Sequence, residues 1–303
     1  MTKKPFFSAL GLSLLFSVAS NAQESVQPVA EKLRQDFPNF DVIRSAVTLT
    51  GGMDLDGSPG DLSVTTYDFR AILSRPIELF EGINMVPFFT YEFTQLNFDG
   101  TGPIPIGDED VSAASLEALF FKSFEHTPWL AIGWTRAELG TDYQGISTDD
   151  LSFDVAAGIA YRFNDGFTLG LGVAVTDING DTQIFPGLNF DWTPTENTRF
   201  SFYGPNLFAR YTINDAWYLS LEGSPNGGVW NINDNGGNSR NLDLDSYLIG
   251  INSHNQIWGE FWMSLGIGYT FFNEIEIRDN GPSFSRDLDG APFAQISLSL
   301  RQW

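Results

Sequence analysis

The stretch FTLGLGVAVT, residues 167–176, alternates large apolar side chains with small or hydroxylated ones at every second position. One face of an extended chain would carry Phe167, Leu169, Leu171, Val173 and Val175. The other face would carry Thr168, Gly170, Gly172, Ala174 and Thr176. A period of two is the period of a β-strand, so this stretch is predicted to be a strand with one apolar face.

The same alternation recurs elsewhere along the chain. LSFDVAAGIAYRF, residues 151–163, leads into the first stretch through Asn-Asp-Gly, a tight hairpin signal, and FWMSLGIGYTF occupies residues 261–271. The strands are longer than the usual five or six residues and match the roughly 9–11 that a tilted strand needs to cross a membrane. Aromatic residues occur at both ends of the apolar faces: they are Tyr161, Phe163, Phe167, Tyr269 and Phe271. A lipid-facing band between aromatic girdles, with a small or polar lumen behind it, is typical of a transmembrane barrel.

Counting alternating stretches predicts an all-β, antiparallel transmembrane β-barrel of about 12 strands, with 10–14 allowed. The predicted strands are 44–53, 61–74, 83–98, 111–124, 129–139, 151–163, 167–176, 182–192, 216–230, 242–252, 260–273 and 291–303. TRFSFYGPNLFARYTI, residues 198–213, is either one more short hairpin about Gly204-Pro205, giving 14, or an irregular strand. Short connections mostly alternate with longer, acidic or glycine-rich ones, as periplasmic turns and outer loops do in bacterial barrels. A secreted β-sandwich or solenoid is the alternative.

The N-terminus is typical of a secretory signal peptide. A basic start, MTKK, precedes an apolar run and the small residues Ser20 and Ala22, so we expect residues 1–22 to be removed by cleavage after Ala22. An uncleaved anchor is the alternative, but the run is short for a membrane span. The polar segment 23–43 is predicted to be a periplasmic leader, and residues 44–303 to form the barrel.

Composition excludes several classes of protein. The chain has no cysteine and two histidines, which excludes disulfides and leaves little room for a histidine metal site. Removing Lys3 and Lys4 with the signal peptide leaves 16 − 2 = 14 basic residues against 38 acidic ones, a net charge of 14 − 38 = −24. Such a surface repels nucleic acid.

The segment FYGPNLFARYTINDAWYLSLEG, residues 202–223, is similar to part of an outer-membrane barrel family of unknown function. Together with the aromatic strands and the final Trp303, it makes the chain resemble a Gram-negative outer-membrane β-barrel. The resemblance implies an outer-membrane location, insertion by the barrel-insertion machinery through Trp303, and contact with lipid and lipopolysaccharide. It supplies no catalytic residue and no cofactor. Trp303 departs from the family pattern, because the apolar Ile296, Leu298 and Leu300 lie one residue out of phase with it.

Charged residues on the small faces are the candidate site. By phase they are Asp68, Arg70, Glu92, Glu117, Asp154, Arg162, Arg210 and Glu222. They form either a salt-bridged lumen that holds the barrel's shape or a selectivity ring in a pore.

The predicted outer loops repeat an Asp-x-Asp/Asn-Gly pattern. Its acidic and amide residues are Asp54, Asp56, Asp177, Asn179, Asp287 and Asp289. Calcium takes such oxygen ligands, but Asp-Gly and Asn-Gly are also common turn residues, and no copy completes an EF-hand loop. Turn chemistry is the favoured interpretation, and binding of divalent cations is the alternative.

An enzyme is not expected, because Ser, His and acidic residues do not converge in the pattern. His126 and His254 are both predicted to lie in short periplasmic turns, and Ser253 beside His254 should point to the opposite face. The leading hypothesis is a porin-like or small-solute passage protein with acidic outer loops. The alternative is a closed structural barrel whose loops bind cations, lipopolysaccharide or a protein partner.

Overall fold

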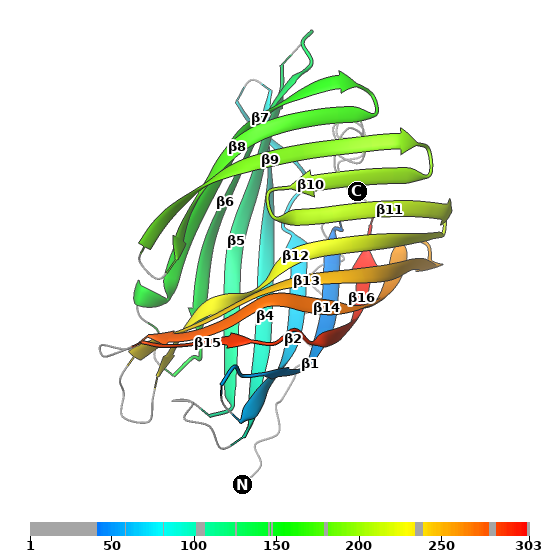
Figure 1. Ribbon diagram of the computed structural model, residues 1–303. Helices are drawn as coiled ribbons and strands as arrows, with labels where there is room; N and C mark the ends of the chain where they lie inside the picture. Colours follow the sequence, from blue (N-terminus) through cyan, green and yellow to red (C-terminus); the bar gives the residue numbers. More distant parts are fainter. Residues whose placement is uncertain are drawn as a thin grey trace. The chain divides into compact units, whose positions relative to one another are not determined.

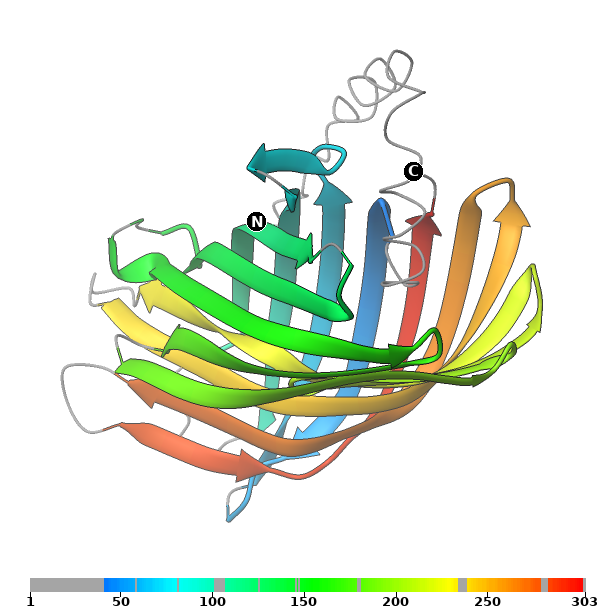
Figure 2. The same cartoon turned by 90° about the horizontal axis from the view of Figure 1, so that it is seen from above.

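Fourteen antiparallel strands close into a barrel in the described part of the chain (Figure 1). The computed structural model describes residues 41–301, apart from residues 58, 81, 101–106, 125, 145, 147, 179–180, 234–238 and 279–282. The barrel strands are β1 (Ile43–Asp54), β2 (Gly60–Ile72), β4 (Ile83–Gly100), β5 (Glu109–Ser123), β6 (Trp129–Thr141), β7 (Leu151–Asn164), β8 (Phe167–Ile178), β9 (Asp181–Thr195), β10 (Thr198–Tyr203), β11 (Asn206–Asn214), β12 (Trp217–Asn233), β13 (Ser239–Trp258), β14 (Phe261–Arg278) and β16 (Pro292–Leu300). Each of these strands pairs with the next one in this order, and β16 pairs with both β14 and β1, so the order of strand pairing closes on itself (Figure 2).

Three short elements lie outside the ring. β3 (Ile77–Phe80) pairs with β4, and β15 (Phe284–Leu288) pairs with β14. The 3-10 helix η1 (Thr148–Asp150) precedes β7. Among the described residues, no helix is long and apolar enough to span a membrane.

The 14 strands fall within the expected range of 10–14, and one hairpin accounts for the two strands beyond the preferred count of 12. The doubtful stretch folds as β10 and β11, joined at Gly204, whose φ of 58° is the left-handed conformation that glycine adopts freely. Their lengths of 6 and 9 residues are short for a membrane crossing, which is why alternation alone did not separate them. The all-β antiparallel barrel itself is confirmed.

The outer face is apolar, as the alternation predicted. Leu169, Leu171 and Val173 are 36%, 64% and 44% exposed, while Gly170 between them is buried. Rings gather at the end of the barrel that carries the short turns: Trp129 packs edge-on to Tyr161, Tyr161 to Phe163, and Phe163 stacks on Phe167. We call this the short-turn end and the opposite one the long-loop end.

The interior of the long-loop end is filled by apolar side chains. This apolar cap consists of Met53, Leu55, Leu62, Val64, Leu96, Val111, Trp230, Ile232, Leu242, Leu244, Ile275, Ile277, Leu288 and Ala291. They come from opposite walls, since β12 bends across the interior until Asn231 pairs with Thr141 of β6 and accepts a backbone hydrogen bond from Asp142. The sequence predicts acidic loops at this end, but its local pattern does not indicate an apolar core beneath them.

Gly140 is where β12 docks on β6. A Cβ added there would overlap the carbonyl oxygen of Val229 and cannot be relieved by rotating a side chain. We therefore expect Gly140→Ala to separate β12 from β6 and to expose Trp230 to protease or aqueous quenchers. Gly133→Ala on the same strand is the matched control, because its nearest neighbour would be 3.6 Å away. Equal fluorescence quenching of the two variants would contradict this docking.

Candidate functional site

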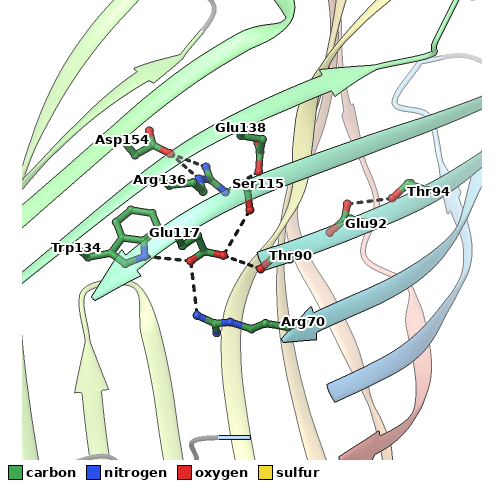
Figure 3. Close-up of polar contacts among 10 residues, drawn as sticks. All are labelled: Arg70, Thr90, Glu92, Thr94, Ser115, Glu117, Trp134, Arg136, Glu138 and Asp154. Atoms are coloured by element: carbon green, nitrogen blue, oxygen red, sulfur yellow. Dashed lines mark hydrogen bonds and ion pairs between the residues drawn. The ribbon is translucent and has the colours of Figure 1, made fainter. Parts of the chain in front are cut away.

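Charged side chains from β2, β4, β5, β6 and β7 meet on the inner face of the wall (Figure 3). Glu117 is the hub of the first group. Its carboxylate lies 3.5 Å from Arg70 Nη2 and accepts hydrogen bonds from Trp134 Nε1 at 3.0 Å and Thr90 Oγ1 at 2.6 Å. Two predicted lumen residues, Arg70 and Glu117, are therefore brought together.

Arg136 organises the second group. It contacts Asp154 Oδ2 through Nε and Nη2, each at 2.7 Å, and Glu138 Oε2 through Nη1 at 3.1 Å. Asp154 was predicted, whereas Arg136 and Glu138 were missed. The signal existed in the sequence, because both share a phase with Trp134 in WTRAELG and lie opposite the inward face of β7.

Asp68 and Glu92 are two further predicted lumen residues, and they lie opposite each other on β2 and β4. Asp68 lies 3.8 Å from Arg44 Nη1, and Glu92 accepts a hydrogen bond from Thr94 Oγ1 at 3.0 Å. Arg70 also lies over the ring of Phe88, 4.5 Å from its centroid. We call Arg44, Asp68, Arg70, Glu92, Glu117, Arg136, Glu138 and Asp154 the charge belt. With three cations and five carboxylates its formal charge is 3 − 5 = −2.

The remaining predicted lumen residues lie on other parts of the wall. Arg162 lies on β7 opposite Thr168, outside the belt. Arg210 of β11 lies over Tyr218, 5.3 Å from the ring centroid. Arg199, which was not predicted, pairs with Asp191 near Arg210. The hydroxyl of Tyr203 donates a hydrogen bond to the same carboxylate at 2.8 Å.

Glu222 belongs to a cluster around His254, which corrects the placement of that histidine. His254 lies within β13 and is buried in the interior, because the polar residues around it conceal the continuing alternation of the strand. Its Nε2 lies 2.7 Å from Ser220 Oγ and 3.2 Å from Glu222 Oε1, and its Nδ1 lies 2.6 Å from Ser264 Oγ. Ser, His and a carboxylate do converge here, contrary to the expectation.

Aromatic and charged neighbours flank the His254 cluster, in which the side chain of Glu222 is 36% exposed. Tyr218 stacks on the imidazole with ring centroids 4.2 Å apart, and Ser220 and Ser264 are 3% and 6% exposed. Arg301 lies over Tyr218 and Trp262 and pairs with Asp41 at 2.8 Å. These contacts form a hydrogen-bond network that joins β12, β13 and β14.

Four of the loop residues considered for calcium, Asp54, Asp56, Asp287 and Asp289, lie in two segments that pair with each other. Two Asp-Leu-Asp-Gly segments pair through a bridge between Leu55 and Leu288, with Asp56 N donating to Asp287 O and Asp289 N to Asp54 O. Both leucines enter the apolar cap, whereas the four carboxylates are exposed. In the described part of the chain no three His, Cys, Asp or Glu side chains form a group that could hold a metal. The side chain of Asp177, and all of Asn179, lie outside the described residues.

Most of the predictions for the two chain ends concern residues that the structure does not describe. Residues 1–40, with the predicted signal peptide and most of the leader, are outside the described residues, as is Trp303. In β16 the inward Ser297 and Ser299 are buried, and the outward Ile296 and Leu298 are 46% and 54% exposed. The phase read from the sequence for this strand is therefore confirmed.

Residues 89–295 match the family described as Domain of unknown function (DUF6268). Among solved structures the chain is similar to the COG4313 outer membrane channel from Pseudomonas putida F1, with 9% identity, coverage of 85% of this chain and 94% of that chain, and a TM-score of 0.43. It is also similar to the NanC porin, with 8% identity, coverage of 85% and 100%, and a TM-score of 0.36. The translocator domain of the autotransporter NalP from Neisseria meningitidis has 9% identity, coverage of 91% and 93%, and a TM-score of 0.35. No curated protein sequence matches the chain.

Proposed function

Because the chain belongs to the DUF6268 family, whose description names no activity, we propose a function from the barrel interior: a small-solute passage protein of the outer membrane, with a narrow lumen that favours cations. One observation carries the proposal: charged side chains that point into the barrel are accessible to water. The side chains of Arg44, Arg70 and Arg136 are 35%, 43% and 35% exposed, although each points away from the lipid-facing side. A lumen filled only by packed side chains would bury them.

The net charge of the belt supports a preference for cations. Rings of carboxylates favour cations in pores, and here five carboxylates face three arginines. Most carboxylates of the charge belt are already paired with an arginine. Their electric field in the lumen is therefore weaker than that of an unpaired acidic ring. We propose modest selectivity and no specific substrate.

The apolar cap supports a gate at the long-loop end. Trp230, Leu242 and Ile275 are 1%, 0% and 0% exposed, so water does not pass through this packing as it stands. We propose that the cap parts for passage and that the resting barrel is closed. The same observation favours the second candidate function, a permanently closed structural barrel whose loops meet cations, lipopolysaccharide or another protein.

The placement in the cell is part of the proposal. Long loops face outward and short turns face the periplasm in bacterial barrels, which would put the apolar cap on the outer side. We propose export by the signal peptide with cleavage after Ala22, insertion through the barrel-insertion machinery, and contact with lipid and lipopolysaccharide. The acidic loops would then face the medium and its divalent cations.

Reversal potentials in a planar bilayer test the passage function. Glu117→Gln removes one carboxylate of the belt, and one unit charge at 4 Å is worth about 1 kcal/mol in water, so we expect the cation-to-anion permeability ratio to fall about fivefold. Glu196→Gln, in the exposed turn between β9 and β10, is the control and should leave the ratio unchanged. Equal ratios in a conducting Glu117→Gln variant and the wild type would contradict a path along the belt. Folding of each variant is checked by its heat-modifiable gel shift.

A further inference from the structure

The wall of the barrel is incomplete beside the hairpin of β10 and β11. β10 last pairs with β9 at Tyr203 and Asn189, and β11 last pairs with β12 at Leu207 and Gly223. Beyond the hairpin β9 continues through residues 188–181, and β12 continues through residues 224–233. Figure 1 shows β9 and β12 diverging past the hairpin turn. We call the space between these two strand segments the notch.

The polar groups at the hairpin tip are paired sideways with the flanking strands. Gly204 N donates to Leu188 O at 3.2 Å and to Asn189 Oδ1 at 3.1 Å. On the other side Tyr247 of β13 reaches past β12 and donates its hydroxyl to Pro205 O at 2.7 Å. A turn that ends in water has no need of such partners, whereas a turn within the hydrocarbon layer must satisfy its backbone internally.

Both edges of the notch carry a proline. The carbonyl of Leu188 faces the hairpin, so the backbone of residue 186, two positions along, faces the same side. Pro186 thus places a nitrogen without a hydrogen at this edge, and Pro225 occurs in the facing segment of β12. Proline occurs in strands where its nitrogen faces away from a ladder, so the β9 edge at Pro186 is suited to remain open.

The notch lies at the level of the lipid-facing band. Ile184 and Leu188 on the outer side of β9 are 68% and 45% exposed, in line with the apolar face of β8. Phe185 points inward between them, yet it is 46% exposed. Inward phenylalanines on fully paired parts of the wall, Phe88 and Phe293, are 3% and 8% exposed. The interior beside Phe185 is therefore accessible.

We propose that the notch is a lateral portal that admits a hydrocarbon chain from the surrounding membrane into the barrel. What adjoins an opening in the lipid-facing band is lipid, and the exposed side chains Ile184, Phe185 and Leu188 on its β9 side are apolar. A single-chain amphiphile would hold its chain against Ile184, Phe185 and Leu188 and place its polar head in the lumen. This inference rests on the proposed passage function and names the class of solute, an amphiphile that moves between lumen and membrane while the apolar cap stays shut.

Single cysteines test the portal, because the chain has none of its own. Bimane is attached at Phe185→Cys, and the barrel is reconstituted in phosphatidylcholine vesicles whose acyl chains carry doxyl quenchers. Leu171→Cys gives the value for full quenching by lipid, because Leu171 points outward and is 64% exposed. Thr168→Cys gives the background value, because Thr168 points inward where β8 pairs with both of its neighbours. We expect quenching at residue 185 to reach at least half of that at residue 171.

Quenching at residue 185 no greater than that at residue 168 would overturn the portal. If Phe185→Cys fails to show the heat-modifiable shift, Gln183→Cys gives the same test from the neighbouring exposed inward position of β9. The outcome is independent of conductance. A folded Trp230→Ala barrel that is silent yet quenched at residue 185 would refute conduction through the lumen and leave the lipid-facing opening standing, and a conducting barrel without quenching would refute the portal alone.

Discussion

Replacing Trp230 by alanine is expected to turn a mostly closed barrel into one that conducts for most of the recording. Trp230 is 1% exposed, and its ring packs in the apolar cap where β12 crosses the interior. Removal of a buried Trp side chain typically costs 3–5 kcal/mol, and here the loss falls on the capped state. A shift of about 3 kcal/mol changes the ratio of open to closed states by roughly 100-fold.

Single-channel recording in planar bilayers measures this effect. Trp258→Ala is the control, because Trp258 is 77% exposed at the short-turn end and stacks only on Phe261 among the ring contacts of the described residues. Its open probability should match that of the wild type. A folded Trp230→Ala barrel that stays as silent as the wild type would show that the cap does not limit passage.

Replacing Arg136 by methionine is expected to destabilise the barrel by about 2 kcal/mol. The change leaves Asp154 and Glu138 close together without the cation that they share. Removing one partner of a fully buried ion pair lowers the free energy of unfolding by about 3–5 kcal/mol. The side chain of Arg136 is 35% exposed, so water compensates part of this loss. The midpoint of urea unfolding, followed by the heat-modifiable gel shift, measures the difference.

The triple variant Arg136→Met, Glu138→Gln, Asp154→Asn should recover most of the lost stability, because it also removes the unpaired carboxylates. Arg286→Met in exposed β15 is the control and should unfold within about 0.5 kcal/mol of the wild type. A stable Arg136→Met variant would mean that the second group of the charge belt does not hold β6 to β7.

Local alternation predicts the strands because it depends on residues two apart. Residues 167–176 became β8 with the expected faces, and the hairpin into it at Asn164–Phe167 was marked by Asn-Asp-Gly. β10 and β11 were ambiguous because their six and nine residues are too short for the pattern to establish itself twice. β13 runs beyond the predicted 242–252 because its ends are polar, and at one of them His254 occupies an inward position that the pattern expects to be small.

Contacts between distant parts of the wall could not be predicted from alternation. Phase placed Arg70, Glu117 and Asp154 on the inner face correctly, but Arg136 becomes visible as a partner only through the register of β6 with β7. The apolar cap needs β12 to bend until Asn231 reaches Thr141, a contact between residues 90 positions apart that no local pattern encodes. The His254 cluster likewise depends on the register of β12, β13 and β14.

The central claim is a membrane-spanning barrel whose two faces alternate along each strand, and a cysteine scan of β8 tests it most directly. Single cysteines at residues 168, 169, 171, 173, 174 and 176 are labelled with bimane in vesicles and challenged with doxyl lipid and with aqueous iodide. The structure predicts strong lipid quenching at Leu169, Leu171 and Val173 and weak lipid quenching at Thr168, Ala174 and Thr176. Lipid quenching without a period of two, or stronger iodide quenching at the odd positions, would contradict the barrel.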